Sequence, residues 1–190
     1  MYPVNRLISA ATTIAVVTFI GGTLILFLYF LTSAFGVSFL GLAFGTVAAL
    51  VNAGVIVWII ITAIRDKQNR QRLFTSVGYM MLNLPVAALY VWIAFMLSNT
   101  MRITFVNEHH MEIKNIAILG CEEKRIKHMR PGQQVSAWIK IPNDCEISVS
   151  YDLNGTRRTE LVYVYVIRNN GKILTYDIGA GRGPFDPVPQ

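Results

Sequence analysis

The stretch Arg65-Asp66-Lys67-Gln68-Asn69-Arg70-Gln71-Arg72 separates two long segments of the chain that carry no charged side chain. The first segment runs from Leu7 to Ile64 and the second from Leu73 to Met101, and neither contains Asp, Glu, Lys, Arg or His. A segment of that length without charge is not compatible with the surface of an ordinary water-soluble domain. We interpret the octapeptide as a short basic loop between membrane-spanning helices.

The composition agrees with a membrane protein that has a modest soluble part. Of the 190 residues, 53% are hydrophobic and 15% are charged, which is typical of integral membrane proteins. The net charge is +6, but Arg6 and the octapeptide account for most of it. The remaining residues are close to neutral and show no basic stripe with interleaved aromatic residues, so we expect no nucleic-acid partner.

The charge-free segments have room for three transmembrane helices, because about 20 helical residues cross a hydrocarbon core of about 30 Å. We expect a transmembrane region over residues 1–101, with helices at about 7–31, 38–64 and 73–98 and a turn at Thr32–Gly36. The first apolar stretch is longer than the ~7–15 residues of a signal peptide's apolar region, so we interpret it as a retained helix.

The distribution of basic residues predicts the orientation, because Lys and Arg remain on the cytoplasmic side of short loops. The turn near Gly36 has no basic residue and is expected outside. We therefore place the N-terminus in the cytoplasm and everything after Met101 outside, which is the periplasm if the membrane is a bacterial inner membrane. The residues that set this topology are Arg6, Arg65, Lys67, Arg70 and Arg72.

Beyond the helices the pattern changes to short runs rich in β-branched residues and separated by turn signals. We expect residues 102–180 to form a small antiparallel β-sandwich of immunoglobulin-like class outside the membrane. The expected strands are Arg102–Val106, Glu112–Leu119, Gln134–Ile141, Glu146–Leu153, Arg158–Arg168 and Lys172–Ile178.

Two turn signals predict that the last three strands form an antiparallel meander. Asn154-Gly155 and Asn169-Asn170-Gly171 each lie between extended apolar runs, and such turns are typical of β-hairpins. In the strand between them, valines alternate with other apolar side chains from Val162 to Val166. Two apolar faces predict a central strand that is covered on both sides.

Residues 181–190 form a tail rich in glycine and proline, a composition that excludes helix and central strand. We expect either a disordered end or a segment that docks on a partner, with Phe185 as its anchor.

The two cysteines, Cys121 and Cys145, are expected to form a disulfide, because the predicted compartment is oxidising. Two separately buried thiols, or a catalytic pair of Cys121 with His109 or His128, are the alternatives. Of His109, His110 and Glu112, only His110 and Glu112 would share a face of a strand, and two ligands are too few for a zinc site. We therefore expect no metal and no cofactor.

Small residues spaced about four apart on the first two helices predict close helix packing in lipid. The two helices could pack on each other as a hairpin, or the small residues could form a seam for another subunit. The series are Gly41, Gly45, Ala49 and Ala53 on the second helix, and Ala11, Ala15, Thr18 and Gly22 on the first.

Asn52 and Asn83 are the most polar residues expected at membrane depth. Each amide should face protein, since an unpaired amide in lipid is costly. Asn83 could satisfy the Met81 carbonyl that Pro85 leaves without a donor, or it could line a path. The expected helices carry no Asp, Glu, Lys, Arg or His, which argues against a proton-coupled transporter, a pump or a voltage sensor.

These features favour a non-enzymatic accessory or structural subunit of a cell-envelope complex. Its expected partners are the lipid bilayer and other envelope proteins or copies of itself. The alternatives are a subunit of an oligomeric channel or transport component, and an exported, membrane-anchored enzyme that uses Cys121 or the pair His109 and His110.

Overall fold

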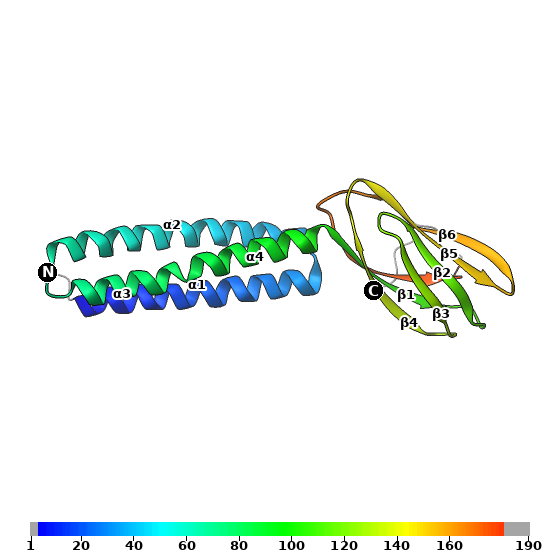
Figure 1. The fold of residues 1–190 in the computed structure, drawn as a ribbon, viewed down its shortest axis with the longest axis horizontal. Coiled ribbons are helices and arrows are strands. Elements are labelled where there is room, and N and C mark those ends of the chain that lie inside the picture. The colour runs from blue at the N-terminus through cyan, green and yellow to red at the C-terminus, as the bar shows by residue number, and fades with distance from the viewer. Residues whose placement is uncertain (1–3, 181–190) are drawn as a thin grey trace. The chain divides into compact units, whose positions relative to one another are not determined.

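The computed structural model describes residues 4–180. The chain divides into two compact units between Ala94 and Phe95, and each unit is described by itself. Within the described residues the helices come first and the strands follow (Figure 1). This order confirms the expected sequence of long apolar helices and then a β-domain.

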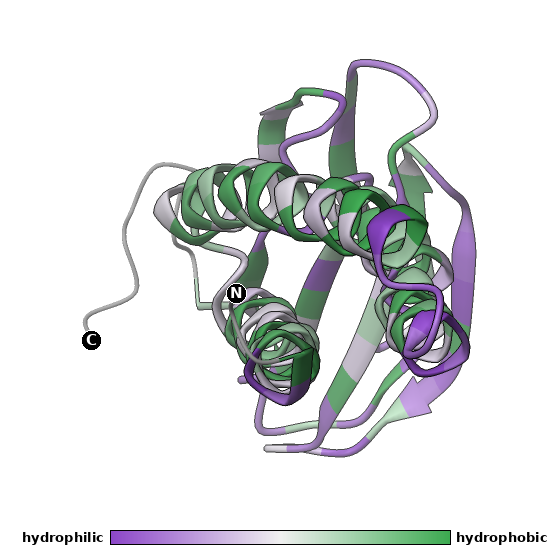
Figure 2. Ribbon diagram, turned by 90° about the vertical axis from the view of Figure 1, so that its left-hand side faces the viewer, coloured by the Kyte–Doolittle hydropathy of each residue, from purple (hydrophilic) through white to green (hydrophobic). Residues whose placement is uncertain are grey.

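The first unit consists of helices that lie side by side. They are α1 (Val4–Thr32), α2 (Phe35–Arg65), α3 (Arg70–Met81) and the first part of α4 (Asn83–Ser98). Three helical stretches, Val4–Thr32, Phe35–Arg65 and Arg70–Ser98, are long and apolar enough to cross a membrane. Large apolar side chains such as Leu42, Leu50 and Val91 are exposed on them. In Figure 2 the hydrophilic colour on the helices gathers at the end where α1 begins and α2 joins α3.

The turn between α1 and α2 is shorter than the predicted Thr32–Gly36. Only Ser33 and Ala34 lie between the helices, and Gly36 belongs to α2. Ser33 takes the left-handed backbone conformation, with φ of 48°, and its N–H donates to the Tyr29 carbonyl at 2.8 Å. The glycine that was expected to allow the turn is therefore not used for it.

The third helical stretch is interrupted at Leu82, where a single helix over 73–98 was expected. The break has a local cause, because Pro85 has no N–H to donate to the carbonyl of Met81. The Leu82 N–H still donates to Gly78 at 3.2 Å, so α3 closes regularly before α4 begins.

The strands of the second unit form two sheets around a common apolar core. One sheet has the order β4-β1-β7 and the other the order β3-β2-β5-β6. The pairs are antiparallel except that β1 and β7 run parallel. The strands are β1 (Thr100–Asn107), β2 (Ile113–Gly120), β3 (Lys124–Met129), β4 (Gln134–Lys140), β5 (Cys145–Leu153), β6 (Thr156–Val166) and β7 (Ile173–Ile178).

Strand β3 was not predicted from the sequence. Four of its six residues are basic, and only Ile126 and Met129 are apolar. It pairs with β2 at the edge of its sheet, with Ile126 opposite Ile116. Charged side chains are common on edge strands because they discourage pairing with another chain. They also interrupt the alternation of apolar residues from which a strand is predicted, so the sequence pattern did not indicate β3.

The predicted meander is half right. Asn154-Gly155 joins β5 to β6 as a hairpin, with Leu153 opposite Thr156 and both turn residues at positive φ. After β6, however, the chain crosses to the other sheet, where β7 pairs parallel with β1. Within the crossing, the Gly171 N–H donates to the Ser98 carbonyl at 2.7 Å, so this glycine serves a close backbone contact instead of a hairpin.

Strand β6 is an edge strand, and its prediction as a central strand was wrong. Val162 and Val166 point into the core, whereas Val164 and Tyr165 are exposed. The apolar residues on both faces therefore do not mean that both faces are covered.

The last turn of α4 is built into the second unit. Leu97 is buried there, and the Ile141 N–H donates to the Asn99 carbonyl at 2.9 Å, beside the Gly171 contact. A Cβ on Gly171 would lie 2.4 Å from the Thr100 carbonyl oxygen. The end of the helix and the start of β1 are thus held by backbone hydrogen bonds from two loops.

Cys121 and Cys145 lie next to each other, at the end of β2 and the beginning of β5. Their sulfur atoms are 1.91 Å apart, within bonding distance, and the separation of 5.3 Å between their Cα atoms is typical of a disulfide. Pairing of Gly120 with Ile147 brings the two strand ends together. This geometry agrees with the predicted pairing.

Breaking this cysteine pair should destabilise the β-domain. The cysteines are 24 residues apart, and closing a loop of that size stabilises a fold by about 3 kcal/mol in the chain-entropy model. We expect reductant to lower the unfolding free energy of the full chain in detergent micelles by about this amount, measured from β-sheet circular dichroism in urea.

The C121S/C145S variant is the matched control, since its unfolding should not respond to reductant. Alkylation of both cysteines in the unreduced, folded protein would contradict the disulfide.

Candidate functional site

The small-residue series on α1 lies at the centre of the helical unit. Ala11 and Ala15 are buried in one cluster with Ile59 of α2 and Leu73 of α3. Further along α1, a Cβ on Gly22 would lie 3.0 Å from the ring of Tyr90 on α4. The series therefore faces all of its helical neighbours, including α3 and α4, and not the α2 hairpin partner alone.

The series on α2 winds away from the other helices. A Cβ on Gly41 would lie 3.3 Å from Ile25, but one on Gly45 would meet no atom within 4 Å. Ala49 and Ala53 are exposed. A step of four residues turns an α-helix by about 40° beyond a full circle, so a strict four-residue series drifts off a straight contact face.

The close contact between α1 and α2 occurs at Gly21, which the sequence reasoning did not single out. A Cβ there would lie 2.6 Å from the tip of the Phe44 ring. Gly21 and Gly22 thus receive one aromatic ring each, from α2 and from α4. The adjacent pair Gly21-Gly22 is the sequence feature that could have indicated a close helix contact. Nothing in the local sequence identifies the residues that pack on it.

Asn83 joins two helices by hydrogen bonds. Its amide nitrogen donates to the Ala15 carbonyl at 3.0 Å and to the Thr18 hydroxyl at 3.2 Å, both on α1. It therefore faces protein, as expected, but its partners are on α1 and not at Met81. Thr18 itself donates to the Ile14 carbonyl at 2.9 Å, so the three polar groups form a small network inside the helical unit.

Only one of the two polar atoms of the Asn52 side chain has a hydrogen-bond partner among the described residues. Its amide nitrogen donates to the Ala48 carbonyl, one turn earlier on α2, at 2.7 Å. Its carbonyl oxygen is buried and has no hydrogen-bond partner among the described residues. Asn52 and Asn83 therefore do not meet, and no shared polar path is formed by this pair.

The basic loop is organised by Asp66. Its carboxylate accepts the backbone N–H groups of Gln68 and Asn69 at 3.1 and 3.2 Å and the Asn69 amide at 2.9 Å. The hydrogen bonds from Asn69, first of all that of its side chain, lower the pKa of Asp66. The carboxylate is thus used within the turn and makes no ion pair with a described basic residue.

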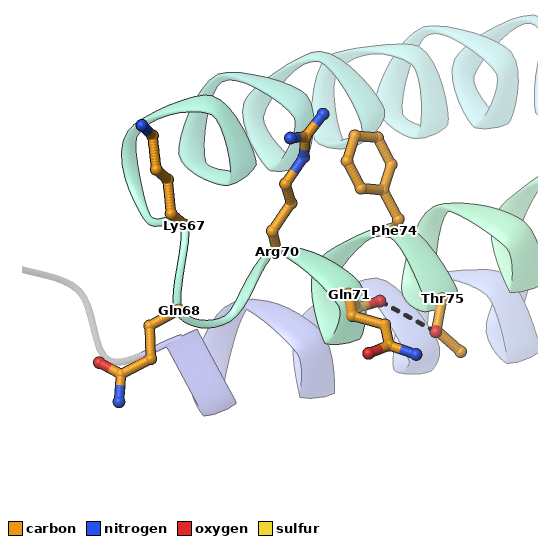
Figure 3. A pocket seen from close by; sticks show the side chains of 6 residues that line it. All are labelled: Lys67, Gln68, Arg70, Gln71, Phe74 and Thr75. Atoms are coloured by element: carbon orange, nitrogen blue, oxygen red, sulfur yellow. Dashed lines mark hydrogen bonds between the residues drawn. The ribbon is translucent and has the colours of Figure 1, made fainter.

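The basic side chains of this loop border a shallow hollow lined by residues from Lys67 to Thr75 (Figure 3). Lys67, Arg70 and Phe74 project to the same side, and the Arg70 guanidinium lies 5.5 Å from the centre of the Phe74 ring. Arg65 ends α2 and Arg72 lies in the first turn of α3. Together they concentrate positive charge at one end of the helical unit.

A polar cluster in the β-domain was missed from the sequence. The Glu160 carboxylate of β6 accepts hydrogen bonds from Tyr151, from the Tyr176 hydroxyl at 3.0 Å and from the Gly179 N–H at 3.2 Å. His109 contacts the Tyr151 hydroxyl through its Nε2 at 2.9 Å. The cluster links β5 and β6 of one sheet to β7 of the other.

The tyrosines of this cluster remain neutral hydrogen-bond donors. Burial, reinforced by the negative charge of Glu160, raises the pKa of Tyr151 and of Tyr176. The donors are supplied by segments far apart in sequence, so no local motif could reveal them. The arrangement fits a structural link between the sheets, because each donor is directed at the one carboxylate.

The residues of the enzyme alternative are engaged in the structure. Cys121 lies at disulfide distance from Cys145, and His109 packs on Gly179 and contacts Tyr151. His110 is exposed on a bend. Among residues 4–180, no three His, Cys, Asp or Glu side chains gather in a way that could hold a metal ion. Phe185 lies outside the described residues.

No protein-family model and no curated protein sequence matches the chain. Among solved structures, the chain is similar to one described as the NMR structure of the protein from Eubacterium rectale. The identity is 13% and the TM-score is 0.34, over 45% of this chain and 84% of that one. A likeness at this TM-score identifies neither the fold nor the function of this chain.

Replacing Asn83 should weaken the helical unit. N83A removes two hydrogen bonds between helices, and intramembrane hydrogen bonds average about 0.6 kcal/mol each. We expect the unfolding free energy in mixed micelles to fall by about 1 kcal/mol, measured by circular dichroism during titration with SDS.

T46A is the matched control, since the exposed Thr46 hydroxyl donates to the Leu42 carbonyl of its own helix and to no other helix among the described residues. Equal effects of the two variants would contradict the role of Asn83 in joining helices.

The two glycines Gly21 and Gly45 should differ in their tolerance of a large side chain. G21L would displace the Phe44 ring, and overpacking of this kind costs about 1–3 kcal/mol, whereas G45L has open space. We expect the thermal midpoint in detergent to fall for G21L and to change little for G45L. An equal fall of the thermal midpoint in both variants would contradict the assignment of the close α1–α2 contact to Gly21.

Proposed function

We propose that the chain is a non-enzymatic membrane protein, an accessory or structural subunit of a cell-envelope complex. Its helices anchor a β-domain at the outer surface of a bacterial inner membrane, and the domain contacts other envelope proteins. The observation that carries the proposal is the pairing of three exposed, apolar helices with a β-domain whose cysteines lie at disulfide distance.

Membrane insertion is supported by the surface of the helices. Large apolar side chains are exposed along each of them, and lipid is the solvent in which such a surface is stable. Helices of 29 to 31 residues exceed the ~20 needed to cross the hydrocarbon core, which leaves room for tilt.

The proposed orientation rests on the basic loop and on the cysteines. Arg65, Lys67, Arg70 and Arg72 favour a cytoplasmic loop between the second and third spans. Three spans then place the β-domain outside, and a disulfide between Cys121 and Cys145 is favoured in that oxidising compartment. We further propose that the two sheets form a small sandwich of immunoglobulin-like class.

The proposed accessory role is supported by the engagement of the polar groups. Asn83, Glu160 and the cysteine pair are used by contacts within the chain. We therefore propose that this protein acts through surfaces that bind partners and not through a catalytic centre.

An oligomeric channel or transport component is a second candidate, favoured by the exposed small residues of α2. Gly45, Ala49 and Ala53 leave a smooth strip on which another helix could pack closely. If this strip joins subunits, G45L should dissociate a homo-oligomer in mild detergent, and the wild-type oligomer should conduct ions in liposomes.

Fusions with reporter enzymes test the proposed topology. Alkaline phosphatase is active only outside the cytoplasm, so we expect activity when it follows residue 190 and none when it is inserted after Gln68. A fluorescent protein that folds only in the cytoplasm should give the opposite pattern at the same two sites. Phosphatase activity in the loop alone would invert the topology and contradict the periplasmic domain.

Gentle solubilisation of native membranes tests the accessory role itself. We expect the chain to migrate in a stoichiometric complex with other envelope proteins on native gels. A chain that stays monomeric in the mildest detergents would contradict this role.

A further inference from the structure

The end of the β-domain that holds the last turn of α4 exposes five large apolar side chains. We call this set the helix-end belt. Its members and their exposed fractions are Trp138 43%, Val164 38%, Tyr165 59%, Ile167 45% and Ile173 45%.

The belt on the sheet β4-β1-β7 is a row across neighbouring strands. Trp138 of β4 pairs with Arg102 of β1, and Arg102 pairs with Ile173 of β7. Arg102 lies at the beginning of β1, close to the end of α4. The strand pairing therefore fixes the positions of Trp138 and Ile173 beside the beginning of β1.

The other part of the belt lies on β6 and the loop after it. Val166 pairs with Cys145 at the beginning of β5, and the Tyr165 hydroxyl donates to Asp144 at 2.9 Å. The loop that follows β6 reaches Ser98 through the Gly171 N–H at 2.7 Å. Both parts of the belt thus lie at the level of the end of α4.

The chemistry of this end resembles that of side chains at a membrane–water interface. Tryptophan and tyrosine are enriched there because each has a large apolar ring and one polar group. Arginine and lysine place their apolar stems beside lipid and their charge among headgroups. Here the Arg102 guanidinium lies 5.5 Å from the Trp138 ring, and the Lys172 ammonium lies 5.8 Å from the Tyr163 ring.

The position of the helix end brings the belt to the interface. The third stretch begins with Arg70 and Arg72 and includes Thr75 and Ser76, while its apolar run continues to Leu97. An apolar run that ends at Leu97 places the outer hydrocarbon boundary there, and the headgroup region adds about 5–8 Å on each side. The loops bonded to Ser98 and Asn99 then enter that region.

We propose that the helix-end belt contacts the interfacial region of the phospholipid bilayer and holds the β-domain against the outer leaflet. This proposal rests on the membrane insertion proposed above. The aromatic rings and isoleucines enter the headgroup layer, and the exposed ammonium of Lys172 contacts phosphates. The bilayer therefore acts as a second support for the domain, in addition to α4.

Depth-dependent fluorescence quenching of single tryptophans tests the proposal in the full chain. The chain has three tryptophans, Trp58, Trp92 and Trp138, so W58F/W92F leaves Trp138 alone and W58F/W138F leaves Trp92 alone. Both proteins are reconstituted in phosphatidylcholine and phosphatidylglycerol vesicles that carry brominated acyl chains. T156W in a chain with W58F, W92F and W138F reports on the β5–β6 hairpin tip, at the far end of the domain.

We expect strong quenching of Trp92 by bromines within the acyl-chain region, and quenching of Trp138 by bromines near the headgroup together with a blue-shifted emission relative to the T156W protein. The T156W protein should not be quenched. Adding I167E and I173E to W58F/W92F should reduce the quenching of Trp138, because the charges expel the belt from the interface.

The outcomes distinguish failure of the belt proposal from failure of membrane insertion. Quenched Trp92 with unquenched Trp138 would overturn the belt proposal and leave membrane insertion intact, with a protein partner as the remaining occupant of the belt. Unquenched Trp92 would overturn membrane insertion and the belt proposal together.

Discussion

Backbone polar groups that leave water must find partners within the protein, and this constraint underlies the whole helical unit. In the bilayer that we propose for them, the segments without charge could not hydrogen-bond to lipid, and the helices satisfy their N–H and C=O groups. Leucine, isoleucine, valine and phenylalanine can then cover the outer surface without penalty. Interruptions occur only where the chain supplies another solution, as at Ser33, whose N–H bonds to Tyr29, and at Leu82, which precedes Pro85.

The same constraint explains where the polar side chains lie. Asn83 directs its amide at α1, where the Ala15 carbonyl and the Thr18 hydroxyl accept it. In the β-domain, Glu160 collects donors from strands of both sheets and so fastens the sheets to each other. In both units a buried polar group gains its stability from segments distant in sequence. Such contacts also specify one arrangement of the elements over others that bury similar apolar area.

Much of the fold could be predicted from local patterns. The three apolar stretches, the basic loop, six of the strands and the Asn154-Gly155 hairpin follow from composition, periodicity and turn chemistry. The failures have a common cause. β3 and β6 are the two edges of one sheet, yet β3 is mostly basic and β6 is apolar on both faces. A pattern reports what a side chain prefers, but the neighbours of a strand depend on the path of the whole chain.

The order of residues alone settles that this chain has long apolar helices, a concentrated basic loop and a β-rich region that begins near Arg102. These properties follow from solvation and local backbone preference, which act over a few residues. The tertiary structure decides which small residues meet: Gly21 receives Phe44, while Gly45 stays open. It also decides that β7 runs parallel to β1, that Asn83 binds α1 and that Trp138 lies near the end of α4. These contacts join segments far apart in sequence, so their geometry exists only once the chain has folded.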